Sequence, residues 1–149
     1  MNYNNIEISR MTIADFEVIK NTLISEFDDF WSPQMLENEL KDINSYYLIA
    51  KINNEIVGFA GMKIIIDEAD IMNVVTKKNQ RNCGIGSTLF KQLILTAIEK
   101  SIKKMTLEVN EKNSAAIHLY EKFGFIQIAI RKNYYNNTEN AVIMQIELN

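Results

Sequence analysis

The sequence predicts an α+β fold with a mixed central β-sheet, and three observations support that prediction. The middle of the chain contains two apolar segments joined by a short polar turn, as in a β-hairpin. A strand-like segment then leads through a Gly-x-Gly turn into an amphipathic helix. The last third contains further strand and helix patterns in alternation. Together these segments give the order β-α-α-β-β-β-α-β-α-β-β.

The first predicted elements are a short strand and two helices. Ile6 and Ile8 alternate with polar residues, which is typical of a strand. Thr12 can cap a helix that has Asp15 in its first turn. Ser32-Pro33 resembles an N-cap followed by proline at the first helical position. The apolar face of the first helix consists of Ile13, Phe16, Ile19 and Leu23.

A β-hairpin is predicted next in the chain. Its strands are Tyr46 to Ile52 and Ile56 to Ile66, and residues 53–55 form the turn between them. Asp67-Glu68 offers a further turn before the strand that contains Ile71 to Val75.

The second half of the chain is predicted to begin with a long helix, about Gly84 to Lys100, followed by a strand over Lys104 to Val109. The next helix runs from Asn113 through Phe123, and Gly124 suits a left-handed C-terminal cap. The last predicted elements are strands over Phe125–Ile130 and Ala141–Glu147 and an Asn-rich loop between them, Asn133–Asn140.

Length and composition bound the class of protein. With 149 residues the chain is expected to form one domain, residues 1–149, with a substantial core. The longest apolar run, Ile56 to Met62, is far shorter than the ~20 residues of a membrane span, and the N-terminus has no signal-peptide pattern. We therefore expect a cytoplasmic protein that does not act at a membrane. The net charge of −3 argues against a nucleic-acid partner, and the single Cys and single His argue against a disulfide or a metal site.

The segment from Arg81 to Gly86, Arg-Asn-Cys-Gly-Ile-Gly, stands between a predicted strand and a predicted helix. Glycines permit close approach of a ligand, and a helix N-terminus offers free N–H groups with roughly half a positive charge, which suits a phosphate. A Rossmann turn needs a third glycine where Leu89 stands, and a P-loop needs Gly-Lys-Ser/Thr, which does not occur. Both nucleotide-binding motifs are therefore excluded.

What remains, Arg-x-x-Gly-x-Gly, resembles the acyl-CoA pyrophosphate loop of the GNAT superfamily of N-acetyltransferases. The stretch from Leu107 to Phe125 resembles one subgroup of that superfamily, the bacterial ribosomal-protein-alanine N-acetyltransferases. Shorter matches at residues 30–32, 67–69 and 131–135 support the likeness. The resemblance implies the acyl-CoA N-acyltransferase fold, acetyl-CoA as co-substrate and a protein N-terminus as acceptor.

The same resemblance implies the roles of individual residues. Glu108 takes the position of the general base and Tyr120 that of the general acid. An N-terminal amine, with a pKa of about 7.7–8.0, is largely protonated at neutral pH, so we expect Glu108 to remove its proton through a water molecule. Trp31 and Tyr134 are expected to wall the acceptor slot. The residues expected to contact CoA are Val74, Val75, Thr76, Arg81, Asn82, Cys83, Gly84, Ile85, Gly86, Ser87 and Asn113.

Taken alone, these side chains also have simpler interpretations. Glu108 lies on the strand face opposite the core-forming residues, where a solvated glutamate would be ordinary. Tyr120 would more often be a core aromatic residue than a proton donor, and Trp31 fits the core as well as it fits a substrate wall. His118 stands two residues before Tyr120, and residues two apart do not share a helix face. His118 is therefore expected on a solvated helix position.

The sequence therefore predicts an acetyl-CoA-dependent N-acetyltransferase that acts by direct transfer in a ternary complex. Its leading acceptor is the N-terminal alanine of a small-subunit ribosomal protein. Two alternatives stay open: an acetyltransferase of a small amine, such as a polyamine or an antibiotic, and a non-catalytic acyl-CoA-binding module. The joint presence of Glu108 and Tyr120 disfavours the second alternative. The sequence does not determine the oligomeric state.

Overall fold

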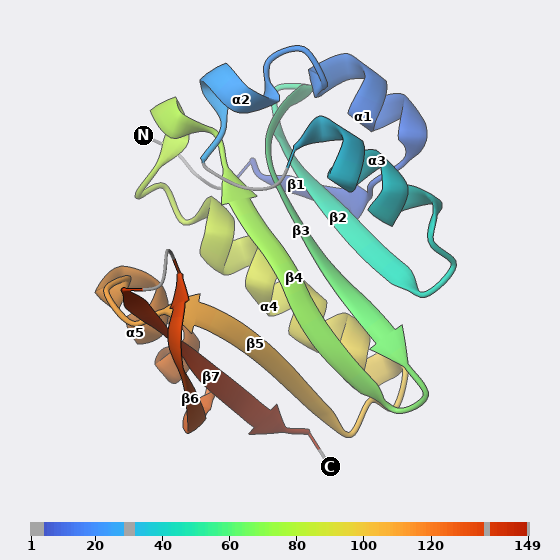
Figure 1. The fold of residues 1–149 in the computed structure, drawn as a ribbon. Helices are drawn as coiled ribbons and strands as arrows, with labels where there is room; N and C mark the ends of the chain where they lie inside the picture. Colours follow the sequence, from blue (N-terminus) through green and yellow to red (C-terminus); the bar gives the residue numbers. More distant parts are fainter. Residues whose placement is uncertain (1–4, 29–31, 136–137, 149) are drawn as a thin grey trace.

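The computed structural model describes residues 5–28, 32–135 and 138–148, which form a mixed sheet with helices on both faces (Figure 1). The seven strands lie in the order β1-β2-β3-β4-β5-β7-β6. Neighbouring strands pair antiparallel except β4 and β5, which pair parallel. The predicted α+β class and mixed sheet are confirmed, and so is the order of elements, apart from a division of the first helix.

Three helices follow the first strand. The strand is β1, Glu7–Arg10, and the helices are α1, Ile13–Ile19; α2, Leu23–Glu26; and α3, Pro33–Lys41. The single apolar helix face predicted up to Leu23 is thus divided, because residues 20–22 form a turn and Leu23 begins a new helical turn. Ile19 and Leu23 are both buried on either side of that turn, so the hydrophobic pattern identified the buried face correctly.

The predicted helix starts are confirmed at α1 and α3. The Thr12 hydroxyl accepts a hydrogen bond from the Asp15 N–H, and the Asp15 carboxylate accepts one from the Thr12 N–H at 2.8 Å. This reciprocal pair satisfies two N–H groups that a bare helix start would leave open. The Ser32 hydroxyl caps α3 by accepting from the Met35 N–H at 3.4 Å, and Pro33 occupies the first helical position.

The central hairpin consists of β2, Ser45–Ile52, and β3, Glu55–Ile65. Asn53 and Asn54 have φ values of 51° and 67°, and two consecutive positive values are what the tightest hairpin turn requires. Asparagine tolerates this conformation better than most residues do. The turn residues therefore explain why the two strands fold back on each other at this position.

The second half of the chain differs from the prediction at two places. Its elements are β4, Glu68–Thr76; the short 3-10 helix η1, Lys78–Gln80; α4, Ile85–Glu99; β5, Lys104–Asn110; α5, Ser114–Lys122; β6, Ile126–Tyr135; and β7, Glu139–Glu147. Glu68 belongs to β4 and not to the preceding turn, because residues 68–70 pair with β5. The loop predicted from Asn133 is also wrong, because β6 continues to Tyr135, where it pairs with Glu139 of β7.

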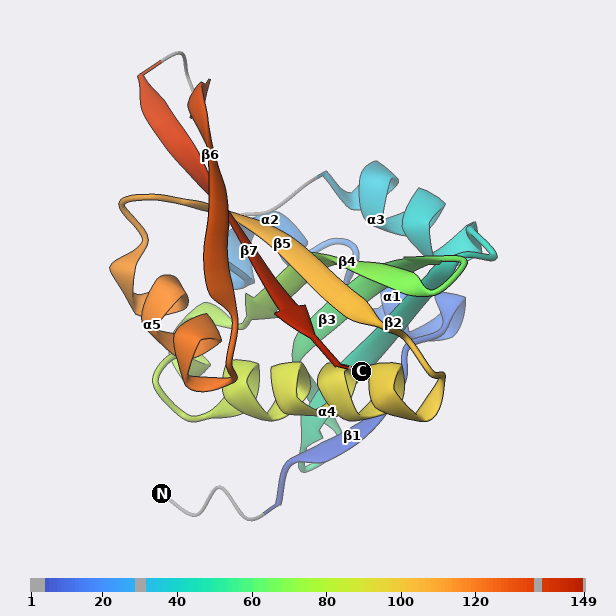
Figure 2. The same ribbon diagram turned by 90° about the horizontal axis from the view of Figure 1, so that it is seen from below.

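The hydrophobic core has one cluster on each face of the sheet. α4 and α5 lie on one side of the sheet and α1 to α3 on the other (Figure 2). Leu89 and Leu93 of α4 are fully buried in the first cluster, and Leu36 of α3 is fully buried in the second. Gly61 of β3 lies directly against the Tyr47 ring, and a Cβ at this position would overlap the ring. Glycine is therefore needed there for close approach.

β4 and β5 pair only over residues 68–70 and 104–106 and then diverge (Figure 1). A bulge in the β3–β4 ladder, where Met62 pairs with Ile71 and Gly61 with Asn73, leaves Met72 as an extra residue on β4. Bulges bend a strand and increase its twist, which helps β4 to leave β5. Within the described chain, the edge of β4 from Ile71 onward that faces β5 has no strand partner.

No helix in the described part of the chain is long and apolar enough to cross a membrane.

Candidate active site

The helix α4 begins directly after the Gly-x-Gly turn. Gly84 is its N-cap and has φ = 80°, a left-handed conformation that favours glycine. No side chain caps this helix start, so the first N–H groups receive no side-chain acceptor. A Cβ built on Gly84 would meet no heavy atom within 4 Å, so the space beside the helix start is open. An uncapped helix start beside open space is suited to binding an anion.

Gly86 lies in the first turn of α4, at a position where the surrounding protein leaves room for a Cβ atom. A Cβ there would lie 3.7 Å from Thr76 Oγ1 and 3.7 Å from Val74 Cγ1, which is ordinary van der Waals contact. Alanine is also the better helix former by about 1 kcal/mol. The packing of the protein therefore does not explain this glycine, whereas close approach of a ligand does.

The residues before α4 are held by contacts within the protein. Arg81 forms an ion pair with Asp28, which follows α2. The Cys83 thiol donates a hydrogen bond to the Arg81 carbonyl oxygen at 3.4 Å and is 6% exposed, within the core. Asn82 has a positive φ of 62°. Both Arg81 and Cys83 thus have structural partners, so the main-chain N–H groups of this loop are its clearest feature for phosphate binding.

The end of β4 lies beside the start of α4. The Val74 and Thr76 side chains border Gly86, whereas Val75 is buried on the opposite face with the α1–α3 cluster. The Thr76 carbonyl oxygen accepts a hydrogen bond from the Asp28 N–H at 3.0 Å. The expected main-chain contacts to CoA at this strand end therefore stay predictions, and the Thr76 carbonyl already has a partner.

A pocket of about 390 Å³ opens where β4 and β5 diverge. It brings together side chains from three strands that are far apart in the sequence. The lining residues are Asp70, Ile71 and Met72 of β4, Thr106, Leu107 and Glu108 of β5, and Tyr134 of β6. The structure thus places two residues selected from the sequence, Glu108 and Tyr134, in one cavity.

Glu108 projects from the face of β5 opposite the buried Leu107 and Val109, as the strand pattern predicted. Arg131 of β6 gives it a counter-ion, with a guanidinium nitrogen 3.1 Å from the Glu108 carboxylate. The same guanidinium lies over the Tyr134 ring, 4.8 Å from its centroid. Arg131 therefore connects the proposed base with the proposed wall of the acceptor slot.

Tyr120 packs against the other side of the sheet. Its ring centroid is 5.0 Å from that of Phe90 on α4 and 6.3 Å from that of Phe125. The Tyr120 carbonyl oxygen also accepts a hydrogen bond from the Phe125 N–H at 3.1 Å, at the end of α5. The ring is packed against the cluster that contains Val109, so Tyr120 and Glu108 approach β5 from opposite faces.

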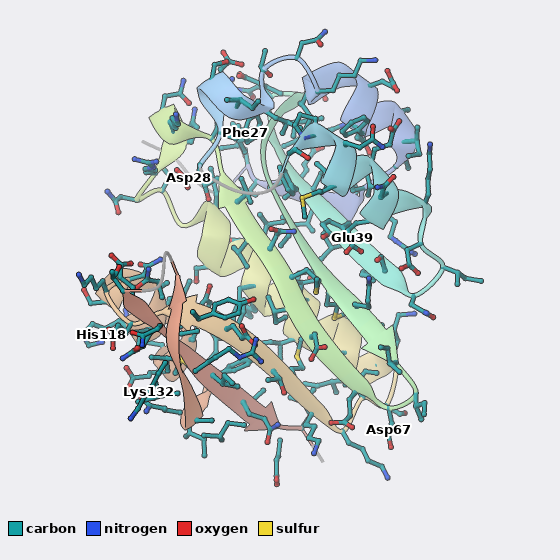
Figure 3. The ribbon with its side chains drawn as sticks, in the orientation of Figure 1. Phe27, Asp28, Glu39, Asp67, His118 and Lys132 are labelled. Atoms are coloured by element: carbon teal, nitrogen blue, oxygen red, sulfur yellow. The ribbon has the colours of Figure 1, made fainter. Side chains whose placement is uncertain are left out.

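The remaining predicted residues have different outcomes. Asn113 is the N-cap of α5, and its side-chain oxygen accepts from the Ala116 N–H at 3.2 Å. Its expected contact with CoA stays a prediction. His118 is exposed on α5, as expected (Figure 3). Trp31 lies outside the described residues. Among the residues that the structure describes, no group of three or more His, Cys, Asp or Glu is placed to hold a metal ion.

Two side chains were missed as functional candidates in the sequence: Asp70, which lines the pocket, and Arg131, which pairs with Glu108. Asp70 lies in the polar first part of β4, and the local pattern does not distinguish it from the neighbouring Glu68. Arg131 could not have been paired with Glu108 from the sequence, because β6 reaches β5 only across β7.

The chain is similar to proteins of known family. A family model described as Acetyltransferase (GNAT) family matches residues 16–125. The ribosomal protein bS18-alanine N-acetyltransferase of Haemophilus influenzae is 38% identical over 143 residues, which cover 92% of this chain and 95% of that protein.

Solved structures agree with this match. The ribosomal-protein-S18-alanine N-acetyltransferase from Escherichia coli superposes with a TM-score of 0.88 at 26% identity, covering 96% of this chain and 94% of that one. A GNAT family acetyltransferase from Elizabethkingia anophelis, solved with acetyl-CoA bound, superposes with a TM-score of 0.80 at 26% identity, covering 97% and 99%.

Proposed function

The chain belongs to the acetyltransferase (GNAT) family, and from this we propose that it acetylates the N-terminal amine of a protein, with the N-terminal alanine of a ribosomal protein as its leading acceptor. The chain is an acetyl-CoA-dependent N-acetyltransferase, as its family membership and its similar proteins establish. The choice of acceptor is supported by the activity for which the similar proteins of Haemophilus influenzae and Escherichia coli are named. A ribosomal acceptor would place the enzyme in the cytoplasm.

One observation carries the proposal: the pocket at the divergence of β4 and β5 joins an acid, Glu108, with an aromatic wall, Tyr134. β4 borders this pocket at Met72 and borders the uncapped start of α4 at Val74. One strand therefore connects a site suited to phosphate with a site suited to an amine. An acyl transfer between a phosphate-bearing carrier and an amine needs these two sites side by side.

We infer that the acetyl-CoA pyrophosphate binds to main-chain N–H groups of the loop from Asn82 to Ser87. Two observations support this placement: the space beside Gly84 is open, and the packing of the protein does not require glycine at position 86. The pantetheine arm would follow the edge of β4 at Val74–Thr76, where no strand pairs with it in the described chain. The thioester would then reach the pocket that contains Glu108.

The transfer itself joins the acceptor nitrogen to the acetyl carbon and breaks the bond between that carbon and the CoA sulfur. Glu108, acting through water, would take a proton from the nitrogen. Tyr120 would give its proton, or a hydrogen bond, to the departing thiolate. Phe90 and Phe125 hold the Tyr120 ring in place for this step. Tyr134 would border the first residues of the acceptor, and a similar role for Trp31 stays a prediction.

A panel of acceptors tests the function. The purified chain should acetylate a peptide that begins with Ala faster than the same peptide beginning with Lys or Leu, and faster than free lysine or spermidine. Release of free CoA thiol and the mass of the acetylated peptide would be measured. Turnover of spermidine without turnover of any peptide would instead support the small-amine alternative. Binding of acetyl-CoA with no turnover of any acceptor would support the non-catalytic alternative.

A further inference from the structure

We propose that Asp70 is the residue that receives the acceptor's ammonium group and accepts its first proton, so that the acceptor pocket works with two carboxylates, Asp70 and Glu108. This inference rests on the proposed function, because it assigns a role in the same pocket. It adds a catalytic residue that the sequence did not indicate.

Asp70 and Glu108 face one cavity from two adjacent strands. Asp70 is directly opposite Thr106 in the parallel ladder, and it is the last residue of β4 that pairs with β5. Glu108 follows two residues after Thr106, on the same face of β5. Both carboxylates line the pocket that opens at this point. A cation that enters the pocket therefore meets acids from both strands.

The two carboxylates differ in their surroundings. Glu108 already has a counter-ion, because Arg131 lies 3.1 Å from its carboxylate and stacks on the Tyr134 ring. Asp70 forms no ion pair with any of the residues that the structure describes. Of the two acids, Asp70 is therefore the one whose charge an incoming ammonium group would neutralise.

The lysine that pairs with Asp70 across the β3–β4 ladder forms its ion pairs with other acids. Lys63 of β3 is the antiparallel partner of Asp70. Its ammonium nitrogen lies 3.3 Å from Glu39 and 3.3 Å from Asp42, acids on and just after α3 (Figure 3 labels Glu39). Two acids on the α3 side thus compete for the lysine that could otherwise pair with Asp70.

Glu68, a charged neighbour of Asp70 on β4, also favours binding of a cation at Asp70. Glu68 stands two residues away on the same strand and is itself paired with Lys104 of β5 at 3.3 Å. Asp70 is exposed as a residue, but partial desolvation of its carboxyl group, and then repulsion from Glu68, raise the pKa of the Asp70 carboxyl above its ordinary value. A carboxylate with a raised pKa is better matched to the pKa of an amine and is therefore the better general base.

Proton balance gives each carboxylate one task. An ammonium group carries three protons on nitrogen and the product amide carries one, so two protons must leave. Asp70 would take the first, which frees the lone pair for attack on the acetyl carbon. Glu108 would take the second through water as the C–N bond forms and the C–S bond breaks. Tyr120 supplies one proton to the thiolate and regains one from solvent, so one proton is released overall.

The test compares Asp70→Asn with Asp67→Asn, a matched control that makes the same substitution earlier in the chain, outside the pocket lining. With the Ala-initiated peptide at pH 7, we expect Asp70→Asn to lower kcat/KM by roughly 10²-fold or more, and Asp67→Asn to change it by less than about threefold. The Asp70→Asn deficit should shrink as the pH rises, because the amine is then already neutral. Affinity for CoA, measured by calorimetry, should be the same in both variants.

The outcomes separate the two proposals. If the parent acetylates the peptide but Asp70→Asn matches Asp67→Asn, or its pH profile runs parallel to the parent's, the role of Asp70 is wrong and the proposed function stands. If the parent acetylates only small amines and Asp70→Asn loses that activity with the same pH signature, the peptide acceptor is wrong and the role of Asp70 stands. If the parent acetylates no amine, both proposals fall.

Discussion

The packing of Tyr120 in the core is compatible with its proposed role as a proton donor. A core aromatic residue and a proton donor are alternatives in the sequence, but a half-buried ring can serve both purposes. Contacts with Phe90 and Phe125 fix the ring, and the phenol group belongs to the same rigid unit. Fixed placement of a donor is what makes it effective in a transition state.

The phenol group can be tested without disturbing the ring. Tyr120→Phe keeps the aromatic packing, so the free energy of unfolding should change by less than about 1 kcal/mol. The value of kcat should nevertheless fall, by roughly 10²–10⁴-fold if Tyr120 transfers its proton. Stopped-time assays with the Ala-initiated peptide would measure kcat, with calorimetry for CoA affinity. A variant with nearly normal kcat would leave Tyr120 as a packing residue only.

At the scale of elements, the start of α4 is where sequence and structure agree most closely. The sequence predicted a strand, a Gly-x-Gly turn and a helix, and the structure adds that no side chain caps the helix. Local patterns suffice here because the glycines, the strand and the helix are contiguous. The same is true of the Thr12 capping box and of the Asn53-Asn54 turn, whose geometry depends on neighbouring residues alone.

Alanine at position 86 should separate the needs of the helix from those of the ligand. Gly86→Ala should raise the free energy of unfolding by up to about 1 kcal/mol, because alanine favours the helix and the protein has room for its Cβ. The same methyl group should weaken CoA binding. Lys91→Ala, on an exposed position of α4, is the control that keeps CoA affinity. Thermal unfolding and calorimetry would provide both measurements.

Gly84→Asp provides a second, electrostatic test of the same helix start. Its carboxylate would occupy the open space beside Gly84 and repel a pyrophosphate. Folded Gly84→Asp and Gly86→Ala variants that both bind CoA normally would remove this loop from the cofactor site.

The element bounds that the sequence did not predict depend on strand pairing. The first residues of β4 are polar or small, and their strand character comes from pairing with β3 on one side and with β5, some 35 residues further on, on the other. β6 extends to Tyr135 for the same reason, because β7 completes its ladder. These pairings form the pocket, so local patterns could not assign Asp70 to it or pair Arg131 with Glu108.

For the whole molecule, Asp70 should make the free energy of unfolding depend on pH. The raised pKa of Asp70 means that the folded state holds a proton more tightly than the unfolded state, whose Asp titrates near pH 3.9. Stability from this group is therefore full at low pH and is lost as the pH rises through the folded-state pKa. Asp70→Asn should be more stable than the parent at pH 7, and that difference should vanish below about pH 4.

Asp42 provides a control of opposite sign. A hydrogen bond from the Asn44 N–H at 2.8 Å, and then one from Lys63, lower the pKa of the Asp42 carboxyl. Asp42→Asn should therefore be less stable than the parent at pH 7, with the deficit shrinking in acid. Urea unfolding at both pH values would measure the differences. A loss of stability at pH 7 in Asp70→Asn would contradict the account of Asp70.

The β6–β7 hairpin stands out from the body of the sheet (Figure 2) and carries Arg131 and Tyr134, whereas the loop proposed to hold CoA belongs to β4 and α4. Part of the proposed acceptor site thus lies in a stretch of sequence separate from the proposed CoA loop, while Asp70 and Glu108 contribute to it from β4 and β5. Substitutions in the β6–β7 hairpin are expected to change which amine is accepted, while the loop between β4 and α4 keeps its conformation. Related enzymes could therefore come to accept different amines through changes in the β6–β7 hairpin, while they keep the same acyl donor.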